Sequence, residues 1–106
     1  MKWFLVVRPF TVSIEEYWPE LDEHLRWMKQ QHDLGNIVLS GPDSTRLVGL
    51  YLIRARSLEA AEAIAGSDPF TLSGKARYEI TEWEIHQAFG VGAFAASGIP
   101  PIDTHA

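Results

Sequence analysis

Two segments of the chain are apolar at almost every position, and they restrict the fold more than any other feature. Residues 2–8 (KWFLVVR) and 48–54 (VGLYLIR) have the length and the β-branched or aromatic content of strands. Successive side chains of a strand point to opposite faces, so both strands are apolar on both faces. Strands of this kind are expected in a sheet that is covered on its two sides.

The stretch 13–35 is predicted to be an amphipathic helix that covers one of these sides. Ser13 and Glu16 form the pattern of a capping box at its start, and Gly35 suits the left-handed position after its last turn. Pro19 predicts a kink or a short opening turn, with the main helix running on to Leu34. The apolar side chains recur every three or four residues, as in a stripe that faces a core; they are Ile14, Tyr17, Trp18, Leu21, Leu25 and Met28.

The remaining segments complete the order strand, helix, strand, strand, helix, strand. The last strand changes the face of its apolar residues midway, which predicts a bulge near Thr81 or burial of both faces. The order is that of a ferredoxin-like α+β domain (βαββαβ), with a four-stranded antiparallel sheet and both helices on one face. The segments are strands at 37–40 and 76–86, a helix at 58–65 between Ser57 and Gly66, and a short helical turn at 68–73.

Residues 1–86 are expected to form this domain. Residues 87–106 are rich in Gly, Ala and apolar side chains, and we expect them to form a tail that docks on the domain or on a partner subunit. Because both helices lie on one face of the predicted sheet, its other apolar face is left uncovered. An exposed apolar surface of that size predicts association, here a homodimer formed sheet to sheet.

Charge and composition argue against several classes of partner and cofactor. The net charge is −5, with three lysines and no basic run, so binding to nucleic acid or to a membrane surface is not expected. There is no cysteine, and the four histidines have no paired spacing, so we expect neither a metal site nor a cofactor. No apolar run has the length of a signal peptide or a spanning helix, which predicts a cytoplasmic location.

His24 is the first candidate for a functional residue, because the helical spacing places it on the apolar face beside Leu25 and Met28. A polar ring in an apolar layer must find a partner or stay neutral, since an unpaired polar group there costs a few kcal/mol. It is either a core histidine bonded to a carbonyl or a proton-transfer residue at the edge of a cavity.

Four phrases in order, EHLRWMKQQHDLGNIVLSGP, SLEAAEAIA, SDPFTLSG and YEITEW, resemble the YciI-like (YCII-related) proteins over residues 2–86. The resemblance implies a dimeric ferredoxin-like α+β barrel with an active site built from His24 and Asp68. Some similar proteins take part in the breakdown of chlorinated aromatic compounds by dehydrochlorination. The residues that carry the resemblance are His24 and Leu25, Gly35, Ser40 to Pro42, and Asp68 to Phe70 with Gly74.

A His–Asp pair can abstract a proton next to a carbonyl or hydroxyl group, because the carboxylate fixes one ring nitrogen and leaves the other to act as a base. Asp68 before Pro69 also fits a helix cap, and the two roles are compatible. Phe70 and Ser40 are the candidates for substrate contacts.

Two functions follow from these residues. The first is a small cofactor-independent lyase or isomerase that acts on a small cyclic or aromatic metabolite, with His24 as base and Asp68 orienting it. The alternative is a non-catalytic dimeric module that binds a small ligand, in which His24 is a core residue.

Overall fold

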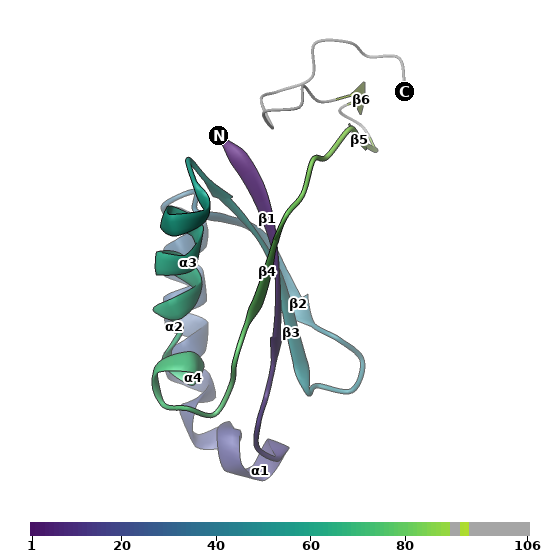
Figure 1. Ribbon diagram of the computed structural model, residues 1–106. Helices are drawn as coiled ribbons and strands as arrows, with labels where there is room; N and C mark the ends of the chain where they lie inside the picture. Colours follow the sequence, from purple (N-terminus) through teal and green to yellow (C-terminus); the bar gives the residue numbers. More distant parts are fainter. Residues whose placement is uncertain (90–91, 94–106) are drawn as a thin grey trace.

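The computed structural model describes residues 1–89 and 92–93 and contains one four-stranded sheet with helices packed against it (Figure 1). Its elements in chain order are β1 (Lys2–Pro9), α1 (Ile14–Tyr17), the 3₁₀ turn η1 (Trp18–Glu20), α2 (Leu21–Asp33), β2 (Ile37–Pro42), β3 (Val48–Ala55), α3 (Leu58–Gly66), α4 (Pro69–Leu72), β4 (Glu79–Glu82), β5 (Gln87–Ala88) and β6 (Gly92–Ala93). No described helix has both the length and the apolar content needed to cross a membrane.

The strand order of the sheet is β2-β3-β1-β4, and each neighbouring pair is antiparallel. The helices α2, α3 and α4 all lie on one side of the sheet (Figure 1). With β1 and β3 in the centre and the two crossovers made through helices, this is the ferredoxin-like arrangement. The predicted α+β fold is therefore confirmed.

Burial along β1 alternates strictly, because its side chains point in turn toward the helices and away from them. The inward residues Phe4, Val6 and Arg8 are buried, while the outward ones are only partly buried. Two apolar clusters fill the space under the helices. The larger consists of Phe4, Val6, Met28, Ile37, Tyr51, Ile53, Ala55, Ala61 and Ala65, and the smaller of Tyr17, Phe70 and Ala76.

The predicted helix over 13–35 begins as expected and is divided at Pro19. The Ser13 hydroxyl accepts a hydrogen bond from the Glu16 amide (3.3 Å), which caps α1. Pro19 lies in η1, which separates α1 from α2, so the short opening turn is confirmed. The apolar stripe serves two purposes, however. Met28 is buried in the core, whereas Ile14, Trp18 and Leu25 stay between 38% and 62% exposed, so the expectation that Leu25 is buried beside His24 is wrong for this chain alone.

The last strand of the sheet is shorter than the predicted 76–86. β4 pairs with β1 over four residues in uninterrupted register, so neither a bulge near Thr81 nor burial of both faces is present. Trp83 lies just beyond the strand and is 48% exposed. The change of face in the sequence therefore marks the end of the strand.

Of the predicted tail 87–106, the structure describes 87–89 and 92–93, where β5 pairs with β6. The rest of that prediction lies outside the described residues, and the boundary near residue 86 stays a prediction.

The face of the sheet opposite the helices is apolar and uncovered in the single chain. Leu39 on β2 is 67% exposed and Leu50 on β3 is 39% exposed. The outward side chains of the central strands continue this surface across the sheet; Trp3, Leu5 and Val7 are partly buried, and Leu52 between them is 6% exposed. Trp83 borders the same hollow of this face as Leu5 and Leu39. We call the surface made by Trp3, Leu5, Val7, Leu39, Leu50, Leu52 and Trp83 the open face.

Candidate functional site

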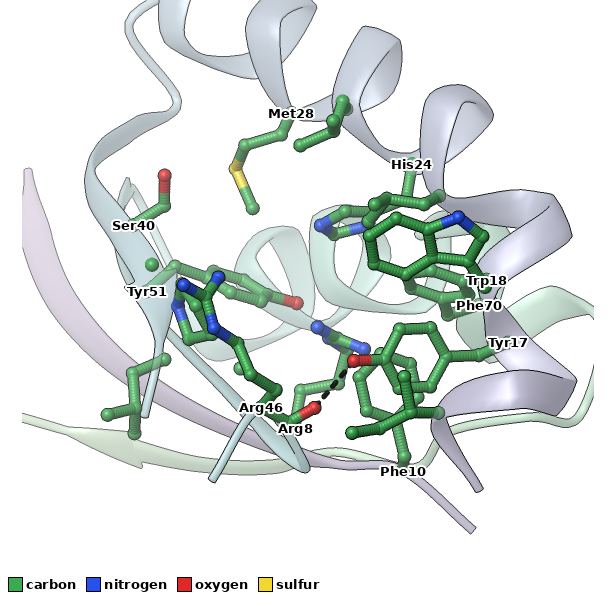
Figure 2. Close-up of a pocket in the computed structure, with 17 residues that line it drawn as sticks. Arg8, Phe10, Tyr17, Trp18, His24, Met28, Ser40, Arg46, Tyr51 and Phe70 are labelled. Atoms are coloured by element: carbon green, nitrogen blue, oxygen red, sulfur yellow. Dashed lines mark hydrogen bonds between the residues drawn. The ribbon is translucent and has the colours of Figure 1, made fainter. Parts of the chain in front are cut away.

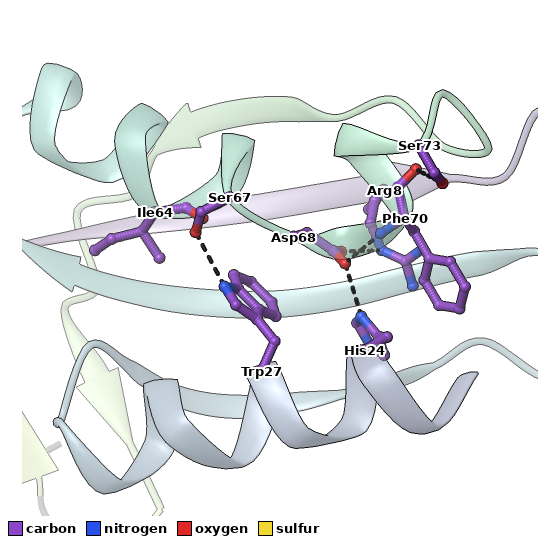
Figure 3. Close-up of polar contacts among 8 residues, drawn as sticks. All are labelled: Arg8, His24, Trp27, Ile64, Ser67, Asp68, Phe70 and Ser73. Atoms are coloured by element: carbon purple, nitrogen blue, oxygen red, sulfur yellow. Dashed lines mark hydrogen bonds and ion pairs between the residues drawn. The ribbon is translucent and has the colours of Figure 1, made fainter. Parts of the chain in front are cut away.

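His24 lies in the first half of α2 and points toward the sheet, with 7% of its surface exposed. Its Nδ1 atom is 2.8 Å from Oδ1 of Asp68 (Figure 3). Asp68 is the residue at the start of α4, which faces α2. The ring stacks on Phe70 at 4.7 Å between centroids and lies 5.9 Å from the ring of Trp27. The histidine therefore has a carboxylate partner, and the interpretation of a bond to a backbone carbonyl is not what the structure shows.

Asp68 is completely buried and serves three groups at once. Oδ1 accepts from the backbone N–H of Phe70 at 3.0 Å, which caps α4, and also contacts His24. Oδ2 lies 3.1 Å from Nε of Arg8 (Figure 3). The sequence left two roles open for Asp68, helix cap and histidine partner, and the residue makes both contacts.

Arg8 is the member of this cluster that sequence reasoning missed. Its side chain is 5% exposed, and its guanidinium group lies 4.5 Å from the ring centroid of Phe10 and 5.1 Å from that of Phe70. Burial lowers the pKa of Arg8, while the charge of Asp68 acts in the opposite direction. The available signal was the alternation of β1, which places position 8 on the same inward face as the buried Val6, where an arginine needs a carboxylate.

Gly49 makes room for this arginine. It faces Arg8 across the β1–β3 pair, and a Cβ atom placed on it would overlap Nη2 of Arg8 and lie 2.9 Å from Cζ. Real Cβ atoms do not come so close to other heavy atoms, so any side chain at this position would displace the guanidinium group. The absence of a side chain at position 49 is therefore part of the site.

We expect Gly49→Ala to lower the free energy of unfolding by about 1–3 kcal/mol, the usual cost of overpacking a buried position. The loss arises because Arg8 must leave its place beside Asp68. Gly41→Ala in β2 is the matched control, because a Cβ atom added there would meet nothing within 4 Å and a small change is expected. Urea unfolding of both variants checks this, and equal losses would contradict the role of Gly49.

A cavity of about 560 Å³ opens beside this cluster, between α2 and the ends of β2 and β3 (Figure 2). His24, Phe70 and Arg8 line it together with Tyr51, and the exposed apolar side chains of Trp18 and Leu25 also belong to its wall. None of the described residues that line the cavity is acidic. The half-exposed part of the apolar stripe on the helices thus lines a pocket.

The predicted contact residues fall at different places in this cavity. Phe70 is fully buried and stacks on the His24 ring. Ser40 lies on β2, on the other side of the cavity in Figure 2, and its hydroxyl is 2.8 Å from Nε2 of His32. The structure therefore brings Phe70 to the His–Asp pair and leaves Ser40 apart from it.

Trp27 fastens α2 to the segment that carries Asp68. Its indole N–H donates to the Ser67 hydroxyl at 3.0 Å, and that hydroxyl donates to the carbonyl of Ile64 at 2.7 Å (Figure 3). Ser67 directly precedes Asp68, so the contact holds His24 and Asp68 at a fixed separation. Within the described residues, no three His, Asp or Glu side chains are placed to hold a metal ion.

The fold and this site define a small ferredoxin-like domain with a buried Arg–Asp–His cluster beside an apolar cavity. The model of the YCII-related domain matches residues 1–84, and the chain belongs to the YCII-related family, as the resemblance in the sequence predicted. An uncharacterised protein of Bacillus subtilis (strain 168), YjpA, is 32% identical over 62 residues, which span 58% of this chain and 73% of that protein.

A solved structure shares the fold. It is 5-chloro-2-hydroxyhydroquinone dehydrochlorinase (TftG) from Burkholderia phenoliruptrix AC1100, in complex with 2,5-dihydroxybenzoquinone. The two structures have a TM-score of 0.66 and 19% sequence identity, over 78% of this chain and 94% of the other.

Proposed function

We propose that the protein is a small cofactor-independent enzyme of the lyase or isomerase type that acts on a small cyclic or aromatic metabolite. His24 is the general base and Asp68 holds its ring. The observation that carries this proposal is the 2.8 Å contact between His24 Nδ1 and Asp68 Oδ1 at the wall of a cavity large enough for such a compound.

The pairing decides which nitrogen of His24 can take a proton. Asp68 forms an ion pair with the guanidinium group of Arg8, and a carboxylate in such a pair can only accept hydrogen bonds. The hydrogen at Nδ1 is then directed to Asp68, and the lone pair at Nε2 is left to accept a proton. Asp68 also stabilises the imidazolium ion once the proton has moved.

The step that this arrangement supports is removal of a proton from a carbon next to a carbonyl or hydroxyl-bearing carbon. In an isomerisation the proton returns to another carbon from the imidazolium ion. In an elimination the electron pair of the broken C–H bond forms the new double bond, and the leaving group departs from the neighbouring carbon with its own electron pair. The name of the dehydrochlorinase with the same fold supports a search for the second reaction.

A second candidate function is a binding module without chemistry. It is supported by the structural duties of Asp68, because a residue that caps α4 and neutralises a buried arginine is needed in a non-catalytic domain as well. His24 would then complete the hydrogen bonding of that carboxylate and line a ligand pocket.

Turnover separates the two candidates. We would incubate the full chain in D₂O with hydroxylated and chlorinated ring compounds, including 5-chloro-2-hydroxyhydroquinone, and follow deuterium uptake and chloride release. The enzyme hypothesis predicts one or both signals above a protein-free control. A compound that binds but shows neither signal would favour the binding module.

The homodimer remains a proposal, and the open face supports it because large uncovered apolar surfaces mark association sites. We expect two copies to associate through this face at micromolar concentration and Leu39→Glu to yield monomers. Leu72→Glu is the control, because Leu72 is 74% exposed but lies on α4, on the helical side. Sedimentation velocity measures the outcome, and a monomeric unmodified chain would contradict the proposal.

A further inference from the structure

Two buried hydrogen-bond donors beside the cavity have no partner within the part of the chain that the structure describes. They are Nη1 of Arg8 and the hydroxyl of Tyr51, and both side chains line the cavity. Nε of Arg8 makes no hydrogen bond either, and its partner is Oδ2 of Asp68 in the ion pair. Arg8 is 4% exposed and Tyr51 is 2% exposed. Buried donors in folded proteins are almost always satisfied by protein, water or ligand atoms, so these two donors are placed to bind a polar atom that enters the pocket.

The two donors are neighbours on the inward face of the sheet. Arg8 pairs with Gly49 across β1 and β3, and Tyr51 pairs with Val6, so the two side chains are diagonal to each other on the same face. Figure 2 shows the Tyr51 hydroxyl and the Arg8 guanidinium group together on the side of the cavity that His24 faces. Asp68 engages only Nε of the arginine, which leaves the outer part of the guanidinium group for another partner.

Tyr51 keeps its proton under ordinary conditions. Burial raises the pKa of its hydroxyl, and the nearby charge of Asp68 raises it further. The hydroxyl is therefore a hydrogen-bond donor at neutral pH.

The charge of the cavity wall favours an anion, although the chain as a whole carries −5. Arg8 and Arg46 both line the cavity, and no acidic side chain is among its described lining residues. Asp68, which lies behind the wall, neutralises Arg8, so the uncompensated positive charge is that of Arg46. Arg46 makes no ion pair with the described residues and adopts a positive φ of 65°, a conformation that is unfavourable for an arginine. The hydroxyl of Tyr17 donates to its carbonyl at 2.7 Å and holds the loop in that conformation.

We propose that the cavity binds ring compounds that carry an ionised oxygen, such as a phenolate or an enolate, and that Arg8 and Tyr51 donate hydrogen bonds to this oxygen. The inference rests on the proposed function and specifies its substrate class. When His24 removes a proton next to a carbonyl carbon, the electron pair of the C–H bond moves toward the carbonyl oxygen. Donors fixed at that oxygen stabilise the charge as it develops.

The test uses two probes of similar shape in calorimetric titrations of the full chain. One is 2,5-dihydroxy-1,4-benzoquinone, an acidic enol that is anionic at neutral pH, and the other is its uncharged dimethoxy analogue. We expect the anion to bind the unmodified protein at least about tenfold more tightly, as hydrogen bonds to charged groups allow. Tyr51→Phe should weaken binding of the anion by about tenfold, leave the uncharged probe unaffected and not lower the melting temperature.

Tyr78→Phe is the matched control, because Tyr78 packs on the core and is not part of the cavity wall. It should bind both probes as the unmodified protein does. Equal affinity for the two probes, no effect of Tyr51→Phe on the anion, or no binding of either probe would each overturn the inference. The proposed function is judged separately by deuterium uptake and chloride release. Anion binding without turnover would therefore support the inference about the ligand and contradict the hypothesis that the protein is an enzyme.

Discussion

Asp68→Ala is expected to lower the free energy of unfolding by about 3–5 kcal/mol, the usual cost of removing one partner of a buried ion pair. The carboxylate is fully buried, and its loss leaves the charge of Arg8 inside the protein without compensation. The N–H of Phe70 also loses its cap, worth about 1 kcal/mol. Urea unfolding followed by tryptophan fluorescence measures the change.

A double-mutant cycle identifies the source of this loss. Arg8→Met removes the buried charge, so Asp68→Ala should cost much less in the Arg8→Met background than alone. Asp68→Asn tests the cap separately, because an amide oxygen still accepts from Phe70 but cannot neutralise the arginine. If Asp68→Ala costs no more than a surface substitution, the Arg–Asp pair is not formed in solution.

The second large effect concerns turnover. On any substrate that shows deuterium uptake or chloride release, we expect His24→Gln to reduce the rate by about 10²–10⁴, the usual contribution of a positioned general base. Glutamine can donate to Asp68 as the ring nitrogen does, but it cannot accept a proton at neutral pH. The fold should persist, and the far-ultraviolet circular dichroism should be unchanged.

The matched control is His86→Gln. His86 is exposed beyond β4, and it does not belong to the cavity wall. Its replacement should leave the rate unchanged, which shows that loss of a histidine alone is not the cause. A His24→Gln variant with undiminished turnover would remove His24 from the mechanism, whatever the substrate.

The fold could be predicted from the sequence because it depends on local patterns. Continuous apolar runs with β-branched and aromatic residues placed β1 and β3. The cap at Ser13 and the proline at position 19 placed the start and the division of the first helix. These signals act over a few residues and need no knowledge of distant contacts. The end of β4 at Glu82 was missed because apolar residues continue beyond it, where the Trp83 amide still donates to the Trp3 carbonyl at 2.9 Å although the strand has ended.

The site was only partly predictable because its contacts join distant parts of the chain. Helical spacing indicated that His24 is buried, but its pairing with Asp68 came from the resemblance to the family. Arg8 was included in the predicted strand 2–8 without any further role, although alternation places it inward. Nothing in the sequence near Gly49 indicates that an arginine from another strand lies over it; only the register of β1 and β3 shows this.

The attachment of α4 to the rest of the domain has a consequence for folding cooperativity. A helix of four residues near the surface would ordinarily open on its own many times before the domain unfolds. Here, local opening of α4 would withdraw Asp68 and leave Arg8 buried without its counter-charge, which costs about 3–5 kcal/mol, a large part of the stability of a small domain. The segment from Ser67 to Phe70 therefore belongs to the same cooperative unit as the central strands, and the candidate catalytic pair exists only in the fully folded protein.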